Sequence, residues 1–475
     1  MHMTVASTLP LPLVIQGGMG AGVSSWRLAR AVSRAGQLGV VSGTGIDTIL
    51  VRRLQDGDIG GHLRRAIAHF PLPEVGLEVL RRYFLPDGRP AGTPYRMLPM
   101  YRQLVSAFRE RVTILANFVE VFLAKEGHDG PVGINLLTKI QLPNLASLYG
   151  AMLAGVDYVI MGAGIPREIP GVLDAFAEHR PASLKLDVVG LAPGESELVS
   201  FDPARHHPAP DAPLRRPRFI PVVSSTSLAT TLARKSTGRV DGFVVEGPTA
   251  GGHNAPPRGE LRLDERGQPI YGERDAVDLE KLRDLGLPFW LAGGMGSPDA
   301  LREARAAGAA GIQVGTLFAW CEESGVAPAL KERILGAVAA GEASVFTDPR
   351  ASPTGFPFKV VELPGDRVRP ERRRRICDLG YLRVPVRAAG GGLAYRCPAE
   401  PVDAYVAKGG DAADTEGRRC LCNGLMADIG LGQLRDDGTE EPPLLTSGDD
   451  LQAVARFLDD RRRYTAERVL EYLLS

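Results

Sequence analysis

The chain has 475 residues, and its 56 basic and 56 acidic residues give a formal net charge of zero. This length suits one large α/β barrel with an extension, and it can bury a full hydrophobic core. The balanced charge provides no overall field that would attract nucleic acid or an anionic membrane, so we expect neither as a partner and expect a small-molecule substrate instead. The N-terminal stretch lacks a basic signal region, and no apolar run reaches the roughly 18 residues of a membrane helix, which predicts a cytoplasmic protein.

Eight short apolar runs alternate with helical patterns rich in Ala, Leu and Arg. Each run is too continuously apolar for a half-exposed antiparallel strand, and most end in Gly or Ser before a helix, as parallel βα units do. In chain order the runs are LVIQGG, LGVVSGTG, VGINLL, YVIMGAG, FIPVVSS, GFVVEG, FWLAGG and GIQVGT. Eight such units predict an α/β protein with a (βα)8, or TIM, barrel, and an open doubly wound sheet is the alternative.

Two of the segments that interrupt this rhythm bear on the domain organisation. The first, from about residue 52 to 128 after the second strand, places Val112, Leu115, Val119 and Phe122 at helical spacing. We expect this insertion either to add to the core or, as the sharper hypothesis, to cap the active site at the barrel mouth. The second begins after residue 360, where the pattern changes to clustered Gly, Asp and Cys. This predicts a barrel over residues 1–360 and a separate Cys-rich module over residues 361–475.

A Gly–Gly pair and a Gly–Thr pair follow the last two predicted strands, where barrels commonly bind phosphate. Gly293 and Gly294 allow close approach of the backbone to an anion, while Gly315 and Thr316 offer N–H groups and a hydroxyl at a helix start. These glycines could also only close tight turns. Because two pairs occur at consecutive strand ends, a phosphate site is the favoured interpretation.

Further candidate cofactor contacts follow the first strand and lie on the third. Gln16, Gly17, Gly18 and Met19 would bring polar and thioether atoms near a flat cofactor. Asn135 is an amide in an otherwise apolar strand, and a buried amide needs partners that a flavin edge could supply.

Four of the five cysteines, Cys377, Cys397, Cys420 and Cys422, occur in the C-terminal segment. Four thiols could form a tetrahedral zinc site or hold an iron–sulfur cluster. Ordinary unliganded thiols remain the alternative, because a Cys-x-Cys pair with distant partners is less specific than two Cys-x-x-Cys pairs. We expect one metal centre, because a metal would stabilise a segment with little apolar periodicity.

The ordered set IQGGMG, GINLL, VVEGPTAGGH, LAGGMG and GIQVGTLF resembles the nitronate monooxygenase family, formerly 2-nitropropane dioxygenases, and the superfamily it shares with FMN-dependent enoyl reductases. The resemblance spans roughly residues 11–359. It implies a (βα)8 barrel that binds FMN and acts as an oxidoreductase. By position it implies that His253 is the active-site histidine, that Gly251 and Gly252 bring the chain close to the flavin ring, and that the later glycine pairs hold the FMN phosphate.

This chain also departs from the family pattern. Thr249 stands where an acidic residue is usual, and Ser224, Ser225 and Thr226 replace a lysine common on the fifth strand. These differences affect the expected substrate more than the cofactor. We expect an enzyme that oxidises a nitronate or a similar small carbanion with O2. The alternatives are an NAD(P)H-dependent enoyl reductase acting on acyl carrier protein thioesters of a fatty-acid or polyketide pathway, or an accessory flavoprotein.

Overall fold

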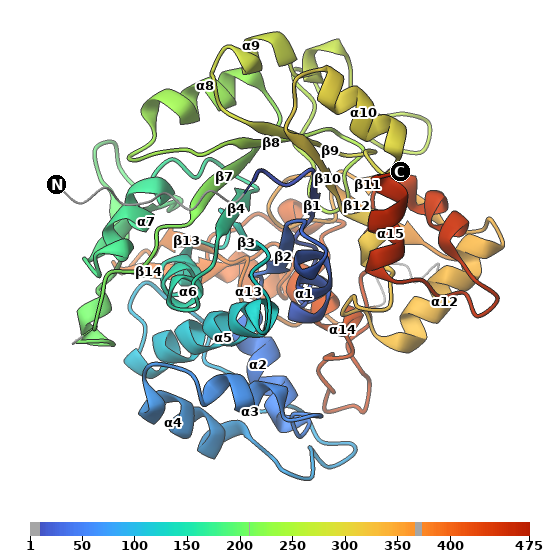
Figure 1. Ribbon diagram of the computed structural model, residues 1–475. Helices are drawn as coiled ribbons and strands as arrows, with labels where there is room; N and C mark the ends of the chain where they lie inside the picture. The colour runs from blue at the N-terminus through green and yellow to red at the C-terminus, as the bar shows by residue number, and fades with distance from the viewer. Residues whose placement is uncertain (1–9, 209, 366–372) are drawn as a thin grey trace.

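In the computed structural model, which describes residues 10–208, 210–365 and 373–475, eight parallel strands form one sheet in the order β1-β10-β9-β8-β7-β4-β3-β2. They are β1 (Val14–Gln16), β2 (Gly39–Ser42), β3 (Val132–Leu137), β4 (Tyr158–Gly162), β7 (Arg218–Val223), β8 (Phe243–Glu246), β9 (Phe289–Ala292) and β10 (Gly311–Val314). The sheet closes where Leu38 N donates to Val14 O and Gln16 N donates to Leu38 O, at 3.1 and 2.9 Å. All eight predicted strands and the predicted barrel are confirmed (Figure 1).

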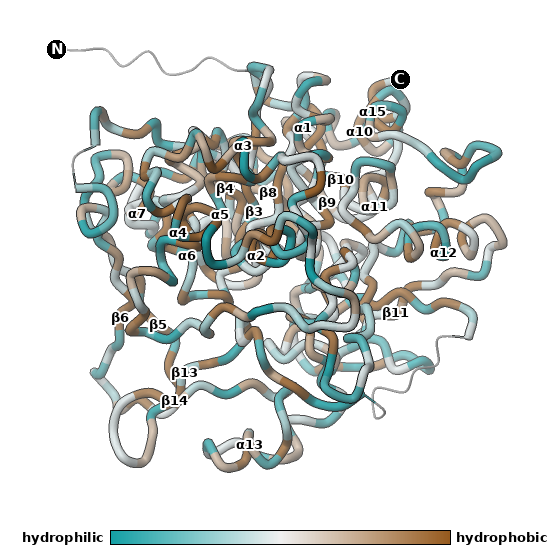
Figure 2. The backbone as a smooth tube through the Cα atoms, turned by 90° about the horizontal axis from the view of Figure 1, so that it is seen from below, coloured by the Kyte–Doolittle hydropathy of each residue, from teal (hydrophilic) through white to brown (hydrophobic). Residues whose placement is uncertain are grey.

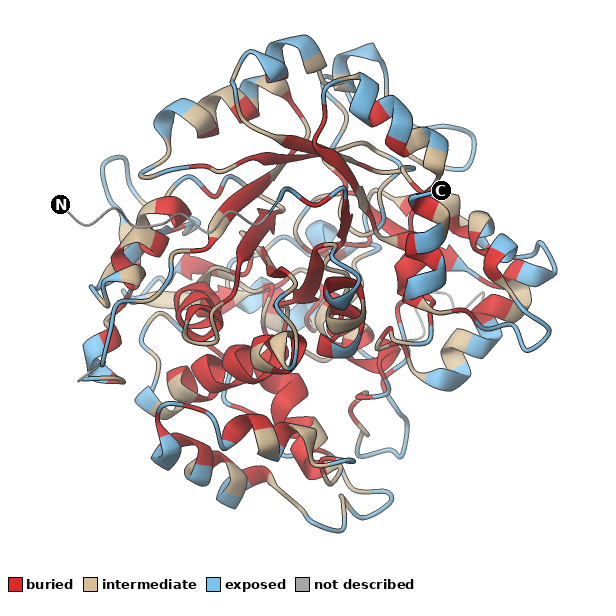
Figure 3. Ribbon diagram, in the orientation of Figure 1, coloured by how far each residue is buried: buried red, intermediate tan, exposed pale blue. Residues whose placement is uncertain are grey.

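The strands alternate between two hydrophobic clusters, which is why their sequences are apolar throughout. Val40 and Val244 belong to the small cluster inside the barrel, whereas their neighbours Val41 and Val245 belong to the large cluster between strands and helices. Successive side chains point to opposite faces of a strand, so a strand covered on both faces is buried at every position. Figure 3 shows the strands buried along their length.

Helices surround the barrel in chain order. They are α1 (Trp26–Arg34), α5 (Ala107–Lys125), α6 (Gln141–Leu153), α7 (Ile169–Ala177), α8 (Thr226–Lys235), α9 (Leu279–Arg283), α10 (Pro298–Ala306), α11 (Thr316–Ala319) and α12 (Pro328–Ala339). Several begin at side-chain caps: Ser106 Oγ accepts from Arg109 N at 3.2 Å, and Ser297 Oγ accepts from Ala300 N at 3.1 Å.

The insertion after β2 contains α2 (Ile46–Gln55), α3 (His62–Ile67) and α4 (Pro73–Tyr83) and ends in α5. The predicted helix is present, and Val112, Leu115 and Val119 are fully buried. α5 packs between α1 and α6 in the outer ring, and α2, α3 and α4 pack against α5 (Figure 1). None of residues 52–128, all of which are described, lines the cavity at the barrel mouth, so the structure differs here from the expected cap.

Shorter elements lie outside the barrel. They are the hairpins β5 (Ala182–Leu186)–β6 (Glu197–Phe201), β11 (Ser344–Asp348)–β12 (Phe358–Glu362) and β13 (Val384–Arg387)–β14 (Leu393–Arg396), the helices α13 (Val402–Ala407), α14 (Leu421–Asp428) and α15 (Ala466–Leu473), and the 3-10 helices η1 (Pro203–Arg205), η2 (Glu273–Asp275), η4 (Ala412–Thr415) and η5 (Asp449–Phe457). Figure 2 shows β13, β14 and α13 grouped with β5 and β6 beyond one end of the barrel.

The C-terminal segment packs directly on the barrel. Val454, Val469 and Leu473 are fully buried in the same hydrophobic cluster as the barrel helices, and α15 contacts α1, α10 and α11. The predicted boundary at residue 361 therefore separates two stretches of sequence that share one core.

Candidate functional site

A cavity of about 220 Å³ opens at the carboxyl ends of the barrel strands, and we call it the central cavity. This volume accommodates a ligand and not only a few ordered waters. Its walls come from the loops after β1, β3, β8, β9 and β10, together with part of the C-terminal segment. The predicted cofactor contacts on these walls are Gly17, Gly18, Met19, Asn135, Gly251, Gly252, Gly293, Gly294, Gly315 and Thr316.

Gln16 is the predicted cofactor contact that does not line the central cavity. Its side chain is fully buried, where Nε2 donates to Ser24 Oγ at 2.8 Å and Oε1 accepts from Val40 N at 3.0 Å. The amide therefore joins the first two strands. From the sequence alone, a glutamine next to a glycine pair could either join two strands in this way or contact a ligand.

The glycines leave room that side chains would fill. A Cβ on Gly18 would lie 2.2 Å from Asn135 Cβ, and a Cβ on Gly293 would lie 3.0 Å from Thr249 Oγ1. Gly293 also has a φ of +91°, which L side chains rarely adopt. These positions therefore require glycine for the loops to come together around the cavity.

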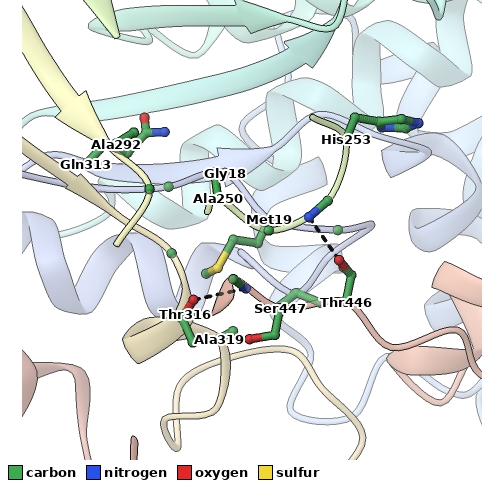
Figure 4. A pocket seen from close by; sticks show the side chains of 18 of the residues that line it. Gly18, Met19, Ala250, His253, Ala292, Gln313, Thr316, Ala319, Thr446 and Ser447 are labelled. Carbon is green, nitrogen blue, oxygen red and sulfur yellow. Dashed lines mark hydrogen bonds between the residues drawn. The ribbon is translucent and has the colours of Figure 1, made fainter. Parts of the chain in front are cut away.

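Residues 445–450, which we call the strap, complete the cavity wall. Thr446 Oγ1 accepts from Gly252 N at 2.9 Å, and Gly448 N donates to Thr316 Oγ1 at 3.2 Å (Figure 4). The strap thus joins the loop after β8 to the loop after β10. Its sequence, LTSGDD, has no periodicity and no catalytic motif, so sequence reasoning missed it.

His253 lines the central cavity at the end of the loop that follows β8. Its Nε2 lies 2.7 Å from Ser352 Oγ, and its ring packs edge-on against Phe358 with centroids 4.9 Å apart. Burial lowers the pKa of this imidazole to about 4, so it is neutral at pH 7. Figure 4 shows the ring turned away from Met19. A neutral imidazole can accept a proton and is a poor proton donor.

Two of the carboxyl groups that line the cavity have strongly raised pKa values. Burial raises the pKa of Glu246, at the end of β8, to about 8, and it raises the pKa of Asp428, at the end of α14, to about 8. Asp428 Oδ1 accepts from Leu444 N at 2.8 Å. Both acids are therefore mainly protonated near neutral pH and can donate hydrogen bonds. Sequence reasoning missed both, because their roles depend on burial.

The cavity wall also contains polar atoms without a protein partner. Gln313 Oε1 and Ser447 Oγ are buried, have no hydrogen-bond partner in the described part of the chain, and belong to residues that line the cavity. A buried polar atom without a partner is costly, and a polar ligand would remove that cost. Together with the glycine loops, these atoms fit a cofactor that has both a phosphate and a ring edge of donors and acceptors, such as FMN.

Lysine and arginine are absent from the described residues that line the central cavity. Asp450 of the strap is close to Thr316, and burial raises the pKa of its carboxyl. A phosphate here would depend on backbone N–H groups instead of a basic side chain. The Ser224–Ser225–Thr226 stretch likewise has hydroxyl groups where the resemblance would lead one to expect a lysine.

The four C-terminal cysteines gather at a different place. Cys377, Cys397, Cys420 and Cys422 all line one small cavity, and all are free thiols. Among the described residues, no three Cys, His, Asp or Glu side chains are arranged to hold a metal ion as they stand. The expected metal centre therefore has no support from a preformed ligand set.

Among the helices that the structure describes, none is long and apolar enough to cross a membrane.

Comparison with known proteins identifies relatives of the barrel. Residues 125–347 match a family model described as nitronate monooxygenase. A nitronate monooxygenase of Pseudomonas aeruginosa is 36% identical over 120 residues, which cover 25% of this chain and 32% of the relative. The match thus spans about a third of that relative's length. The family match runs from before β3 to beyond β10, so it includes the loop of His253 and the glycine loops after β9 and β10.

Several solved structures are also similar. FabK from Thermotoga maritima is 17% identical with a TM-score of 0.45, covering 100% of this chain and 96% of that one. Nitroalkane oxidase from Streptomyces ansochromogenes is 16% identical with a TM-score of 0.45, covering 98% and 94%. The enoyl reductase domain of MlnA from the macrolactin biosynthesis cluster of Bacillus amyloliquefaciens is 12% identical with a TM-score of 0.47, covering 97% and 93%.

Proposed function

We propose that the chain is an FMN-dependent oxidoreductase whose active site is the central cavity, because residues 125–347 match the nitronate monooxygenase family model. The observation that carries this proposal is the convergence of four glycine-containing loops, after β1, β8, β9 and β10, on one cavity. This cavity also contains Gln313 Oε1, which has no hydrogen-bond partner among the described residues. FMN supplies the redox chemistry when bound, taking up or releasing the electrons that the substrate gains or loses.

The chain's own residues would hold the cofactor in two places. Backbone N–H groups at Gly293, Gly294 and Gly315, with the Thr316 hydroxyl, would bind the phosphate. Gln313 and Asn135 would face polar atoms of the ring system, and Met19 would pack against it. The strap would limit the escape of the bound group, since it joins the loops on either side of the phosphate site.

The substrate class that we propose is a nitronate or a similar small carbanion, oxidised with O2. His253 is neutral, so it can accept a proton from the α-carbon of a carbon acid or orient an anionic substrate. The protonated carboxyls of Glu246 and Asp428 would donate hydrogen bonds to the substrate's oxygen atoms, which favours the build-up of negative charge on those oxygens.

A second candidate is NAD(P)H-dependent reduction of an enoyl thioester carried by an acyl carrier protein. The observation that favours it is again the protonated carboxyl of Glu246, because this reaction requires a proton donor for the reduced double bond. In this reaction Glu246, instead of the weakly basic His253, would donate the proton. An accessory flavoprotein without turnover is the third possibility.

One experiment separates these functions. The purified protein is reduced anaerobically with NADPH while its flavin absorption is followed, and the reduced protein is then mixed with an enoyl thioester; O2 uptake is measured separately with a nitronate. Rapid O2 uptake with nitronate and slow bleaching by NADPH support the main proposal. Fast bleaching by NADPH followed by reoxidation with the enoyl thioester supports the reductase and contradicts the monooxygenase. Neither reaction, in a protein that contains FMN, supports the accessory role, and a protein without FMN contradicts all three.

A further inference from the structure

The four C-terminal cysteines come from three separate segments and line the same small cavity. Cys377 precedes β13, Cys397 follows β14, and Cys420 and Cys422 stand at the start of α14. All four line a single cavity of about 10 Å³, which has room for one water-sized particle. The other residues around it are mainly apolar, with Leu382, Ala399 and Leu421 among them. The fifth cysteine, Cys321, is buried elsewhere and donates to Phe318 O at 3.2 Å.

We propose that these four cysteines bind one thiophilic metal ion such as Zn²⁺. Four thiolates at about 2.3 Å form the usual tetrahedral shell of a structural zinc site. The small volume of the cavity favours a single ion over a cluster of several iron and sulfur atoms. Because the side chains as they stand do not form a ligand set, the sulfur atoms must turn inward when the ion binds.

The surroundings provide positive charge for such a centre. Four thiolates around a divalent cation have a net charge of −2, which is costly to bury without compensation. Arg383 lines the cavity itself. Arg375 is held beside Cys397, since it donates to Pro398 O at 2.9 Å and to Thr415 O at 2.6 Å.

The same centre would fix one wall of the central cavity. Cys420 is the N-cap residue of α14, and Cys422 lies in the first turn of this helix. Leu425 and Asp428, further along α14, line the central cavity. At 1.5 Å per residue the helix places them about 5 and 9 Å along its axis from Cys422. A metal at the cysteines would therefore be structural and would position α14, whichever reaction the barrel catalyses.

The test is elemental analysis of the full-length protein purified anaerobically without a metal-binding tag. We expect about one equivalent of zinc per chain, with no iron or acid-labile sulfide. The variant Cys420→Ser/Cys422→Ser should retain less than about a tenth of the zinc, whereas Cys321→Ser should retain all of it. The flavin content of the double variant should stay close to that of the wild type, because the phosphate loops lie on the barrel strands.

A second measurement keeps the test decisive if the double variant does not fold. Wild-type protein is produced with Co²⁺ in place of zinc, and its spectrum is examined for the intense bands of tetrahedral cobalt thiolate. These bands would support the site. Wild-type protein without stoichiometric metal, metal that remains in the double variant, or iron together with sulfide would each overturn the proposal of a single ion.

Discussion

At the scale of single residues, the position of His253 leads to a first prediction. His253→Ala should retain FMN and lose turnover by roughly 10²-fold, the usual contribution of a positioned acid or base. The imidazole lines the cavity but lies outside the phosphate loops, so binding of the cofactor should not need it. The flavin absorption per chain and kcat measure the two effects separately. A fully active variant would mean that the ring only fills the space beside Phe358.

Ser352→Ala is the matched control for this experiment. It removes the hydrogen-bond partner of His253 Nε2 and leaves the ring in place. If the ring acts chemically, this control should change the pH dependence of turnover much more than it changes the amount of bound FMN.

Glu246 leads to a prediction about pH. Its pKa in the folded protein is about 8, above the ordinary value of 4.5, so the folded state binds the proton more tightly than the unfolded state. The resulting stabilisation is fully present below pH 4.5 and is lost as the pH rises through about 8. The variant Glu246→Gln cannot ionise, so its stability relative to the wild type should increase over this range by no more than about 1.4 kcal/mol per pH unit.

Urea unfolding of both apoproteins at several pH values measures this difference. Glu400→Gln serves as a control, because Glu400 is a buried carboxylate that has an ion-pair partner, Lys408, at 2.7 Å. A difference between wild type and Glu246→Gln that does not change with pH would show that the Glu246 carboxyl ionises normally.

At this scale the sequence indicates where the backbone needs glycine, but it does not indicate which polar side chains are buried. Gly293 was predicted for close approach of the backbone and Gly18 as a contact near a flat cofactor, and at both positions the structure leaves little room for a Cβ. Gln16 was predicted as a cofactor contact, but its amide bonds to Val40 N between strands. Glu246 was missed because the residue type does not indicate that the carboxyl is buried at a strand end.

At the scale of elements, the loop after β10 leads to a third prediction. Gly315→Leu should remove most of the bound FMN, because a Cβ at this position already touches Met19 Sδ at 3.5 Å and a longer side chain would enter the central cavity. Gly390→Leu is the control, since Gly390 is exposed between β13 and β14 and a Cβ there meets no atom within 4 Å. Unchanged flavin content in Gly315→Leu would place the phosphate elsewhere.

The contact between the strap and the loop after β8 leads to a fourth prediction. A Cβ on Gly251 would lie 2.7 Å from the carbonyl carbon of Ser447 and 2.8 Å from Gly448 N, so the strap has to move away in Gly251→Ala. We expect faster release of FMN on dilution and faster proteolysis within the strap. In Gly272→Ala, where the added Cβ meets nothing, both rates should match the wild type. Equal rates in both variants would show that the strap does not retain the cofactor.

The helices and strands themselves were largely predictable from the sequence, but the elements against which they pack were not. Strands buried on both faces produce apolar runs, so all eight could be located from the sequence. The helix from residue 107 to 125 was also expected, but its place in the outer ring follows from packing against α1 and α6. The strap could not be foreseen, because its cavity contacts are made by two backbone N–H groups of glycine and by short polar side chains.

At the scale of the whole molecule, α15 leads to a fifth prediction. Leu473 is fully buried in the core shared with the barrel helices, so Leu473→Ala should destabilise the protein by about 2–5 kcal/mol. Its neighbour Leu474 is 42% exposed, and Leu474→Ala should change stability by less than about 0.5 kcal/mol. In calorimetry of Leu473→Ala we expect one unfolding transition at lower temperature. A shift confined to one of two transitions would instead show that residues 361–475 unfold separately.

The closure of the barrel has a consequence for synthesis on the ribosome. Val14 pairs with Ile312, and the last residue that lines the central cavity is Asp450. A nascent chain that has not yet reached β10 has no partner for one edge of β1 and exposes an open sheet edge. Such edges favour aggregation, and long-range parallel pairing folds slowly. The cavity can therefore acquire its full affinity for a ligand only after about 450 residues have been made. A limited supply of cofactor would then leave completed chains without cofactor, but it would not change how the barrel forms during synthesis.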